Sequence, residues 1–368
     1  MNKIKILSFF SGGGFLDMGF EKAGFDTVWS NEYEIVFGEI YSQGLTSWSK
    51  SENINKNYKI SNNKPVEKIE SKSIIKEAFN NQKPDIFGMI GGPPCQDFSL
   101  NGKRNGFDGD RGKLTRVYIN KILDIKPTFF LMENVPGLVG LKHAKPIFNQ
   151  LIESLKDDYY VVATKLNALE YGVPQSRERI FVAGFLKSRL IENRKDFIWP
   201  QALYPNALKA YNWPKLNDFG KKIYKPKGIP IELCVQSCLK KQNEKTANID
   251  EFFKFKNNKE KRMAIKEGDT QRHSFKRLHR YRYSPTTSYG NNEVHLHPYE
   301  DRRISVREAL RIQGVPDTYV ISPKINMTKK FKVISNGVPV PLAFEIAKSM
   351  KEYIKNNING YLEQEKKK

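Results

Sequence analysis

The sequence predicts an α/β protein built on a doubly wound sheet, with a smaller, mostly irregular or β second domain. The apolar run at 4–10 is followed by the glycine loop 11–14 and a helical stretch, the β–loop–α opening of such a sheet. Short apolar runs then alternate with helix-like segments up to about residue 190. Beyond that point prolines recur and basic residues multiply, so the regular alternation ends.

Each element follows from its local pattern. The first helix should end at Ala23, where Gly24 supplies a left-handed cap. A second strand at 26–30 leads into Asn31-Glu32-Tyr33, and the Asn-, Lys- and Ser-rich stretch 46–65 predicts a surface excursion. The other expected strands are 85–90, 128–132, 161–166 and 179–185, and the other expected helices are 145–155, 305–313 and 341–354.

The charge balance points to a polyanionic partner. The 368 residues carry a formal net charge of +22, which favours nucleic acid as a partner. A generally lysine-rich proteome is the alternative, since Lys, Asn and Ile are all abundant. No apolar run approaches the roughly 18 residues of a membrane span, and the apolar start is too short for a signal peptide. We therefore expect a cytoplasmic protein.

The number and spacing of the three cysteines argue against a disulfide framework and against a metal site. Cys95, Cys234 and Cys238 are odd in number and widely spread. Cys234 and Cys238 could share a helix face, but no second pair completes a zinc site. We expect no metal, and we interpret this pair as small buried thiols.

The glycine loop and the acid after the second strand suggest a nucleoside site. Gly12, Gly13 and Gly14 let a ligand approach the backbone, and Glu32 can bind two ribose hydroxyls. Asp17, near the helix start, disfavours a phosphate, so a nucleoside without phosphates fits better. The alternative is a tight turn with a surface acid.

Cys95 follows two prolines at the end of a predicted strand, where open α/β sheets place their sites. A thiolate nucleophile needs a nearby cation, and Arg177 and Arg179 are candidates, while Glu133 ends another strand at the same edge. The glycine-rich, charged loop 102–112 has the composition of a mobile lid. The alternatives are a buried structural cysteine, a solvated arginine pair and a strand-end cap.

The stretch 272–283 interleaves basic and aromatic residues in a way that suits phosphate contacts. Its candidate contacts are Lys276, Arg277, Arg280 and Arg282. A charged strand face is the alternative interpretation.

Together these segments resemble the DNA cytosine-5-methyltransferase family, in the order that the family uses. The matching blocks are Phe9-Phe10-Ser11-Gly12-Gly13-Gly14, Asn31-Glu32-Tyr33, Pro93-Pro94-Cys95-Gln96, Glu133-Asn134-Val135, the Q-x-R-x-R of Gln175, Arg177 and Arg179, residues 297–302 with 307–313, and Ser335-Asn336-Gly337-Val338-Pro339. Phe15 and Ser335 replace usual glycines, and Pro65 falls where the family has an acid near the adenine amino group. The resemblance leaves out roughly 190–280.

The resemblance implies a Rossmann-like S-adenosylmethionine-dependent methyltransferase fold. Residues 1–190 would form the catalytic and cofactor-binding domain, 191–325 the target-recognition domain, and 326–368 a segment that returns beside the cofactor loop. The implied S-adenosyl-L-methionine contacts are Phe10, Gly12, Gly13, Gly14, Glu32, Tyr33, Leu114 and Asn336.

It also implies the chemistry on a cytosine flipped out of double-stranded DNA. Cys95 would attack C6, Glu133 would hold the N3 and amino edge, and Arg179 would hold the O2 side. Arg177 would hold a backbone phosphate or the catalytic loop. The implied DNA contacts are Gln96, Ser99, Arg111, Lys276, Arg277, Arg280, Arg282 and Thr286.

Three alternatives accompany this interpretation. An RNA cytosine methyltransferase shares the motif set, but the long basic insert favours DNA. A catalytically dead DNA-binding regulator is disfavoured by the intact Cys95, Glu133 and Arg179. An NAD-dependent dehydrogenase would leave Cys95 unexplained. We expect a monomer, paired in function with a restriction endonuclease.

Overall fold

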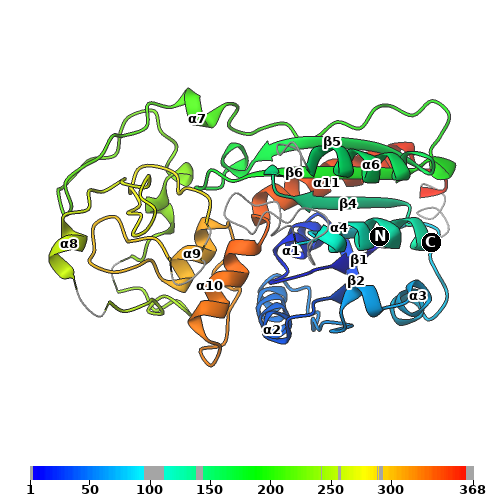
Figure 1. The fold of residues 1–368 in the computed structure, drawn as a ribbon, viewed down its shortest axis with the longest axis horizontal. Helices are drawn as coiled ribbons and strands as arrows, with labels where there is room; N and C mark the ends of the chain where they lie inside the picture. The colour runs from blue at the N-terminus through cyan, green and yellow to red at the C-terminus, as the bar shows by residue number, and fades with distance from the viewer. Residues whose placement is uncertain are drawn as a thin grey trace.

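A computed structural model describes residues 3–94, 112–137, 144–241, 243–255, 258–287, 289 and 293–361 of the chain. Figure 1 shows two lobes, with the sheet and its helices on the right and the short helices α7, α8 and α9 on the left. Within the described residues, every helix is too short or too polar to span a lipid bilayer.

The right-hand lobe is built on a six-stranded sheet of order β2-β1-β3-β4-β6-β5. Strands β1 to β4 pair in parallel, and β6 runs antiparallel to both of its neighbours, β4 and β5. The strands are β1 Ile4–Phe9, β2 Phe25–Asn31, β3 Phe87–Gly91, β4 Phe129–Asn134, β5 Tyr159–Asn167 and β6 Glu178–Leu186. All six strands expected from apolar runs are confirmed, because strands covered on both faces are apolar almost throughout.

Helices cover both faces of this sheet. Side chains of β1 alternate between the two layers: Ile4 and Ile6 pack with one apolar cluster, and Leu7 and Phe9 with the other. The first cluster includes α1 Phe15–Lys22 and α11 Val340–Asn357. The second includes α3 Ser71–Phe79, α4 Gly112–Ile125 and α6 Ala144–Lys156. The predicted doubly wound α/β fold is therefore confirmed.

Helices α1 and α11 lie against each other although more than 300 residues separate them. A Cβ atom added at Gly19 of α1 would lie 2.4 Å from the Cβ of Ala343 of α11. Two backbones can approach this closely only where a side chain is missing. Gly19 therefore allows the late helix to complete the layer that the first helix begins.

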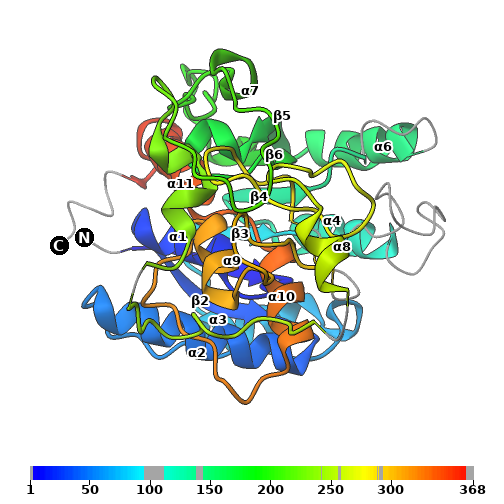
Figure 2. The same cartoon turned by 90° about the vertical axis from the view of Figure 1, so that its left-hand side faces the viewer.

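The left-hand lobe is mostly irregular, as Figure 2 shows with α8, α9 and α10 in front of the sheet. Its elements are α7 Ala207–Ala210, the 3-10 turns Ile231–Leu233 and Val235–Cys238, α8 Lys259–Met263, α9 Val306–Ile312 and α10 Met327–Asn336. Ser305 and Glu308 form a reciprocal capping box at the start of α9. One apolar cluster joins α9 and α10 to α2 Ile35–Ser51, so the lobe packs directly against the sheet domain.

The predicted surface excursion at 46–65 is wrong at its start. Helix α2 spans Ile35–Ser51, and Leu45 and Trp48 are fully buried. The hydroxyls of Ser47 and Ser51 donate to backbone carbonyls of the same helix. Such bonds allow polar residues within a helix. The polar composition of this stretch led to the wrong prediction, because the helix has one apolar face.

Candidate active site

The glycine loop after β1 is closed by the acid that follows β2. The Gly12 amide donates to Glu32 Oε2 at 2.9 Å, and the Glu34 amide donates to Glu32 Oε1 at 2.8 Å. Burial raises the pKa of Glu32, although these amide donors oppose the rise. A Cβ atom at Gly12 would meet only the Phe10 carbonyl, at 4.0 Å. The loop therefore leaves open space above a fixed carboxylate.

Two aromatic residues border this open space. Tyr33 is 67% exposed, although tyrosine usually buries much of its ring. Phe10 has a positive φ of 54°, and its ring lies 6.2 Å from that of Tyr118 on α4. Leu114 lies one helical turn before Tyr118 and is half-buried, so it shares that face of α4. A flat ring could be held between such groups.

Residues before and after α10 pack against the glycine loop. Tyr319 donates its hydroxyl to the Gly13 carbonyl at 2.7 Å. The Phe15 ring is buried, and a Cβ atom at Gly337 would lie 2.2 Å from it. Phe15 is tolerated at a usual glycine position because Gly337 leaves space for its ring. Asn336, next to Gly337, is exposed on this side.

Two other positions near the glycine loop were singled out in the sequence, and Asp17 differs from expectation. Asp17 does not lie at the mouth of the loop, because it is fully buried and accepts a hydrogen bond from Tyr41 at 3.1 Å. Burial raises its pKa to about 6. Pro65 follows Lys64, whose carbonyl accepts from the Asn31 side chain at 3.0 Å. The segment that holds Pro65 therefore lies beside the end of β2.

A buried ion pair lies at the carboxyl end of β4. Arg179 Nε lies 2.9 Å from Glu133 Oε1, and both side chains are only about one-tenth exposed. Burial raises the pKa of Glu133, while Arg179 and Arg177 oppose the rise. Burial thus favours the protonated form of this carboxyl group, and the guanidinium favours its anion. That property suits a group that exchanges a proton with a ring.

The chain before Cys95 abuts this pair. A Cβ atom at Gly92 would lie 2.9 Å from Glu133 Oε2, and Asn134 Nδ2 donates to the Pro93 carbonyl at 3.4 Å. The segment that leads into the cysteine motif is thus fixed beside Glu133. Sequence reasoning missed Gly92, although its place before two prolines was a usable signal. Cys95, Gln96, Ser99 and Arg111 lie outside the described residues.

Arg177, for which a contact with a phosphate or the catalytic loop was expected, lies inside the protein, and that role stays a prediction. Arg177 is only 1% exposed. It donates to the Ser335 carbonyl at 2.8 Å and to the Thr287 carbonyl at 3.4 Å. These carbonyls engage both terminal nitrogens of the guanidinium, while Nε is buried without a hydrogen-bond partner among the described residues. Arg177 thereby joins β6 to the segment that carries Asn336.

A buried amide pair, which sequence reasoning did not connect, completes this junction. Gln175 Oε1 accepts from the Thr287 amide at 3.2 Å, and Gln313 Nε2 donates to Thr287 Oγ1 at 3.1 Å. Gln313 also donates to the Ile334 carbonyl at 2.8 Å. All three side chains are buried. The ends of α9 and α10 are thereby fixed to the strand that carries Arg179.

Two of the predicted DNA contacts are engaged inside the protein. Arg277 is 1% exposed and donates to the carbonyls of Ile265, His297 and Arg262 at 2.9, 2.6 and 2.8 Å. The prediction of a phosphate contact at Arg277 is therefore wrong. Arg280 forms a two-pronged pair with Glu267, at 2.9 and 2.7 Å. Its guanidinium is likewise committed.

The other predicted contacts in this segment are more open. Lys276 and Arg282 are half-buried, and the Arg282 guanidinium lies 5.8 Å from the Tyr283 ring centroid. Thr286 is exposed and donates its hydroxyl to the Ser176 carbonyl at 2.8 Å. The role of these three positions stays a prediction.

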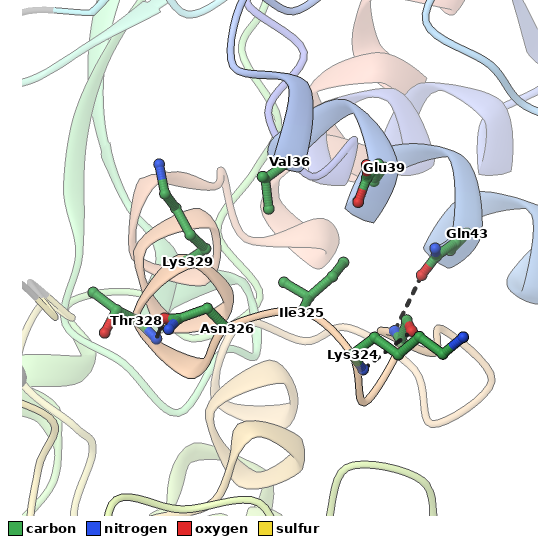
Figure 3. Close-up of a pocket in the computed structure, with 9 residues that line it drawn as sticks. Val36, Glu39, Gln43, Lys324, Ile325, Asn326, Thr328 and Lys329 are labelled. Atoms are coloured by element: carbon green, nitrogen blue, oxygen red, sulfur yellow. Dashed lines mark hydrogen bonds between the residues drawn. The ribbon is translucent and has the colours of Figure 1, made fainter.

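A large surface cavity lies away from this chemistry. It is lined by α2 and by the segment that leads into α10, including Val36, Gln43 and Ile325 (Figure 3). The Gln43 side chain accepts from the Ser322 amide there at 3.1 Å. Neither Glu133 nor Arg179 lines it, so it is not the base site. The described residues hold no cluster of His, Cys, Asp and Glu suited to a metal.

The comparisons with known proteins agree with this geometry. The family described as C-5 cytosine-specific DNA methylase matches residues 4–352. Type II methyltransferase M.NmeDI of Neisseria meningitidis serogroup C is 41% identical over 96% of this chain and 85% of its own. Type II methyltransferase M.FnuDI of Fusobacterium nucleatum is 32% identical over 95% and 94%.

Solved structures show the same fold. A protein described as a DNA modification methyltransferase encoded within an Escherichia coli prophage superposes with a TM-score of 0.68 at 25% identity, over 96% of this chain and 100% of its own. The Spodoptera frugiperda DNMT2 structure gives a TM-score of 0.58 at 17% identity, over 95% and 100%. The chain belongs to the C-5 cytosine-specific DNA methylase family and is a DNA (cytosine-5)-methyltransferase of the type II restriction-modification kind.

Proposed function

We propose that the protein methylates C5 of a cytosine flipped out of double-stranded DNA, with Cys95 as the nucleophile. The observation that carries the proposal is the buried Glu133–Arg179 pair, 2.9 Å apart, against the glycine that precedes Pro93-Pro94-Cys95. A ring edge with one acceptor nitrogen and one amino group fits such a pair, because the carboxyl can both donate and accept. A base stacked in a duplex cannot reach it, so flipping is required.

The proposed covalent step begins at the cysteine. The Cys95 thiolate adds to C6 and breaks the C5–C6 double bond, so that the electron pair makes C5 nucleophilic. Glu133, as the neutral acid, donates a proton to N3 and removes the charge that develops on the ring. After C5 has gained its methyl group, its proton passes to solvent water, which reforms the C5–C6 double bond and expels the Cys95 thiolate, and N3 returns its proton to Glu133. Arg179 orients Glu133 throughout and faces the O2 side of the ring.

The residues of the glycine loop fit S-adenosyl-L-methionine. Glu32 can accept from two ribose hydroxyls, while the open backbone at Gly12 allows a close approach. Phe10, Tyr33 and Leu114 supply apolar contacts for an adenine ring, and Gly13, Gly14 and Asn336 border the remaining part of the molecule. When bound, the cofactor supplies the electrophilic methyl group that C5 receives. Cofactor use is implied by the family itself.

We further propose that the enzyme acts as a monomer beside a cognate restriction endonuclease. The names of its relatives, type II methyltransferases, support this pairing. The net charge of +22 supports a direct contact with duplex DNA.

The test is bisulfite sequencing of plasmid DNA from a methylation-free host that expresses the chain, beside a Cys95→Ala control. Conversion-resistant cytosines within one short motif, absent from the control, are the expected result. Uniform conversion by a folded wild-type protein would overturn the proposal, and resistance that persists in the control would overturn the role of Cys95.

A further inference from the structure

The segment between Gly220 and Gly228, here called the lysine loop, is an exposed basic surface. It contains Lys221, Lys222, Tyr224, Lys225 and Lys227. All four lysines are exposed, and Tyr224 is 80% exposed. Both bounding glycines adopt positive φ, 78° and 77°, and a Cβ atom at either would meet nothing within 4 Å. The chain thus turns at two glycines and projects the loop into open space.

The charge of this loop is not neutralised locally. None of its four ammonium groups forms an ion pair with the residues that the structure describes, and Lys222 Nζ lies 5.7 Å from the Tyr224 ring centroid. An exposed tyrosine among lysines contributes nothing to an apolar core. By contrast, Arg277 and Arg280, in the stretch first predicted to hold phosphates, are committed internally. The loop therefore keeps positive charge that Arg277 and Arg280 have committed to the interior of the lobe.

The base of the loop is rigidly held. Arg280, fixed by Glu267, also donates to the Lys221 carbonyl at 3.2 Å, and its guanidinium lies 4.2 Å from the Tyr299 ring centroid. Asn217 and Glu267 exchange two backbone hydrogen bonds, at 3.1 and 2.8 Å. Arg280 is thus a positioning residue, because it fixes the point where the loop leaves the lobe.

The residue that holds the base of the loop is linked through a short stretch of chain to the segment that leads into β6. Ser284, four residues after Arg280, donates its amide to the Pro174 carbonyl at 2.8 Å and accepts from the Ser176 amide at 2.9 Å. Four residues span at most about 14 Å, which matches the rise of about four nucleotides along one DNA strand at 3.4 Å each. Arg280, which holds the base of the loop, therefore lies within about that span of Ser284, which pairs with Ser176 just before β6.

We propose that the lysine loop binds the phosphate backbone of the duplex beside the flipped cytosine, with Tyr224 packed against a deoxyribose. The inference rests on the proposed function and identifies which part of the target region holds the DNA. Lysine is a mobile point charge, suited to phosphate oxygens and poorly suited to reading a base edge. The loop therefore supplies affinity and register, while other residues determine the target sequence.

The test compares two triple variants of the full chain by DNA affinity over a range of salt concentrations. One replaces Lys222, Lys225 and Lys227 with alanine, and the matched control replaces the exposed Lys50, Lys72 and Lys76 of α2 and α3. Each phosphate contact contributes about 0.9 to the slope of log affinity against log salt. We expect the slope of the loop variant to fall by about 2 to 3 and its affinity at low salt to fall at least about tenfold. The control should match the wild type.

Further readouts separate the possible failures. S-adenosyl-L-methionine affinity and thermal melting should be unchanged in both triple variants, and the methylated motif should remain the same. Tyr224→Ala should weaken DNA binding about threefold to tenfold, and Tyr224→Phe should restore it. An unchanged salt slope in the loop variant overturns the inference, and so does a changed motif, which would make the loop a base reader. Failure of the wild type to bind DNA would instead overturn the proposed function.

Discussion

The sheet domain and the irregular lobe satisfy the hydrogen bonds of their backbones by different means. In the sheet, strands pair with strands, and residue types follow the pleat. In the irregular lobe, buried arginines replace the missing strand partners, because Arg277 and Arg307 donate to carbonyls of unpaired loops. Buried carbonyls need donors, and an arginine offers five. Part of the basic composition of this lobe is therefore structural, and only the remaining part is available to bind DNA.

The largest expected effect is in the sheet domain, where one substitution should lower the methylation rate and leave the stability nearly unchanged. Glu133→Gln removes the proton donor but keeps the shape of the side chain, so we expect the methylation rate constant to fall about 10²- to 10⁴-fold. The melting temperature should change by only a few degrees. Single-turnover methylation and calorimetry measure the two quantities. The exposed Glu67→Gln is the control, and a loss of rate below about threefold in Glu133→Gln would contradict the role.

In the irregular lobe, we expect the opposite pattern at Arg277. Arg277→Met leaves the carbonyls of Ile265, His297 and Arg262 without their donor, which should lower the free energy of unfolding by about 3–5 kcal/mol. Urea denaturation measures this free energy of unfolding. Arg272→Met, at an exposed arginine paired with Asp269 at 3.4 Å, should lower it by less than about 1 kcal/mol. Equal effects at the two sites would mean that buried arginines do not hold this lobe.

A smaller effect tests the packing of α1 against α11. Gly19→Ala places a methyl group 2.4 Å from the Cβ of Ala343, and we expect it to destabilise the protein by about 1–3 kcal/mol. Ala343→Gly should restore part of this loss in the double variant, because it removes the opposing methyl group. A coupling energy of zero in the double-mutant cycle would contradict the close contact between positions 19 and 343.

The smallest effect concerns pH. Burial raises the pKa of Asp17 from 3.8 to about 6, so the native state holds this proton more tightly than the unfolded chain. The stabilisation is complete below about pH 4 and is lost as pH rises through about 6. Asp17→Asn cannot ionise, so its melting temperature relative to the wild type should increase between pH 5 and pH 8. A constant difference would show that Asp17 does not titrate in this range.

Local patterns were sufficient for the sheet and for part of the site. The strand ends that carry Glu32 and Glu133 follow from short apolar runs whose burial is dictated by their neighbours in sequence. The roles of Arg177 and Arg277 could not be predicted, because the carbonyls that accept from them belong to segments up to 158 residues away. A buried arginine and a phosphate-binding arginine have the same local sequence signature. Only the fold distinguishes them.

The contact between α1 and α11 can form only late in the synthesis of the chain. The first helix begins at Phe15 and its partner at Val340, so 325 residues must be translated between them. At about 5–20 residues per second, the ribosome needs roughly 16–65 s for that interval. During this time, the first helix lacks the neighbour that covers it, and the glycine loop lacks Tyr319 and Gly337. A nascent chain therefore cannot complete the surroundings of its glycine loop before translation has passed the irregular lobe, so the proposed cofactor site forms only in chains that already carry this lobe.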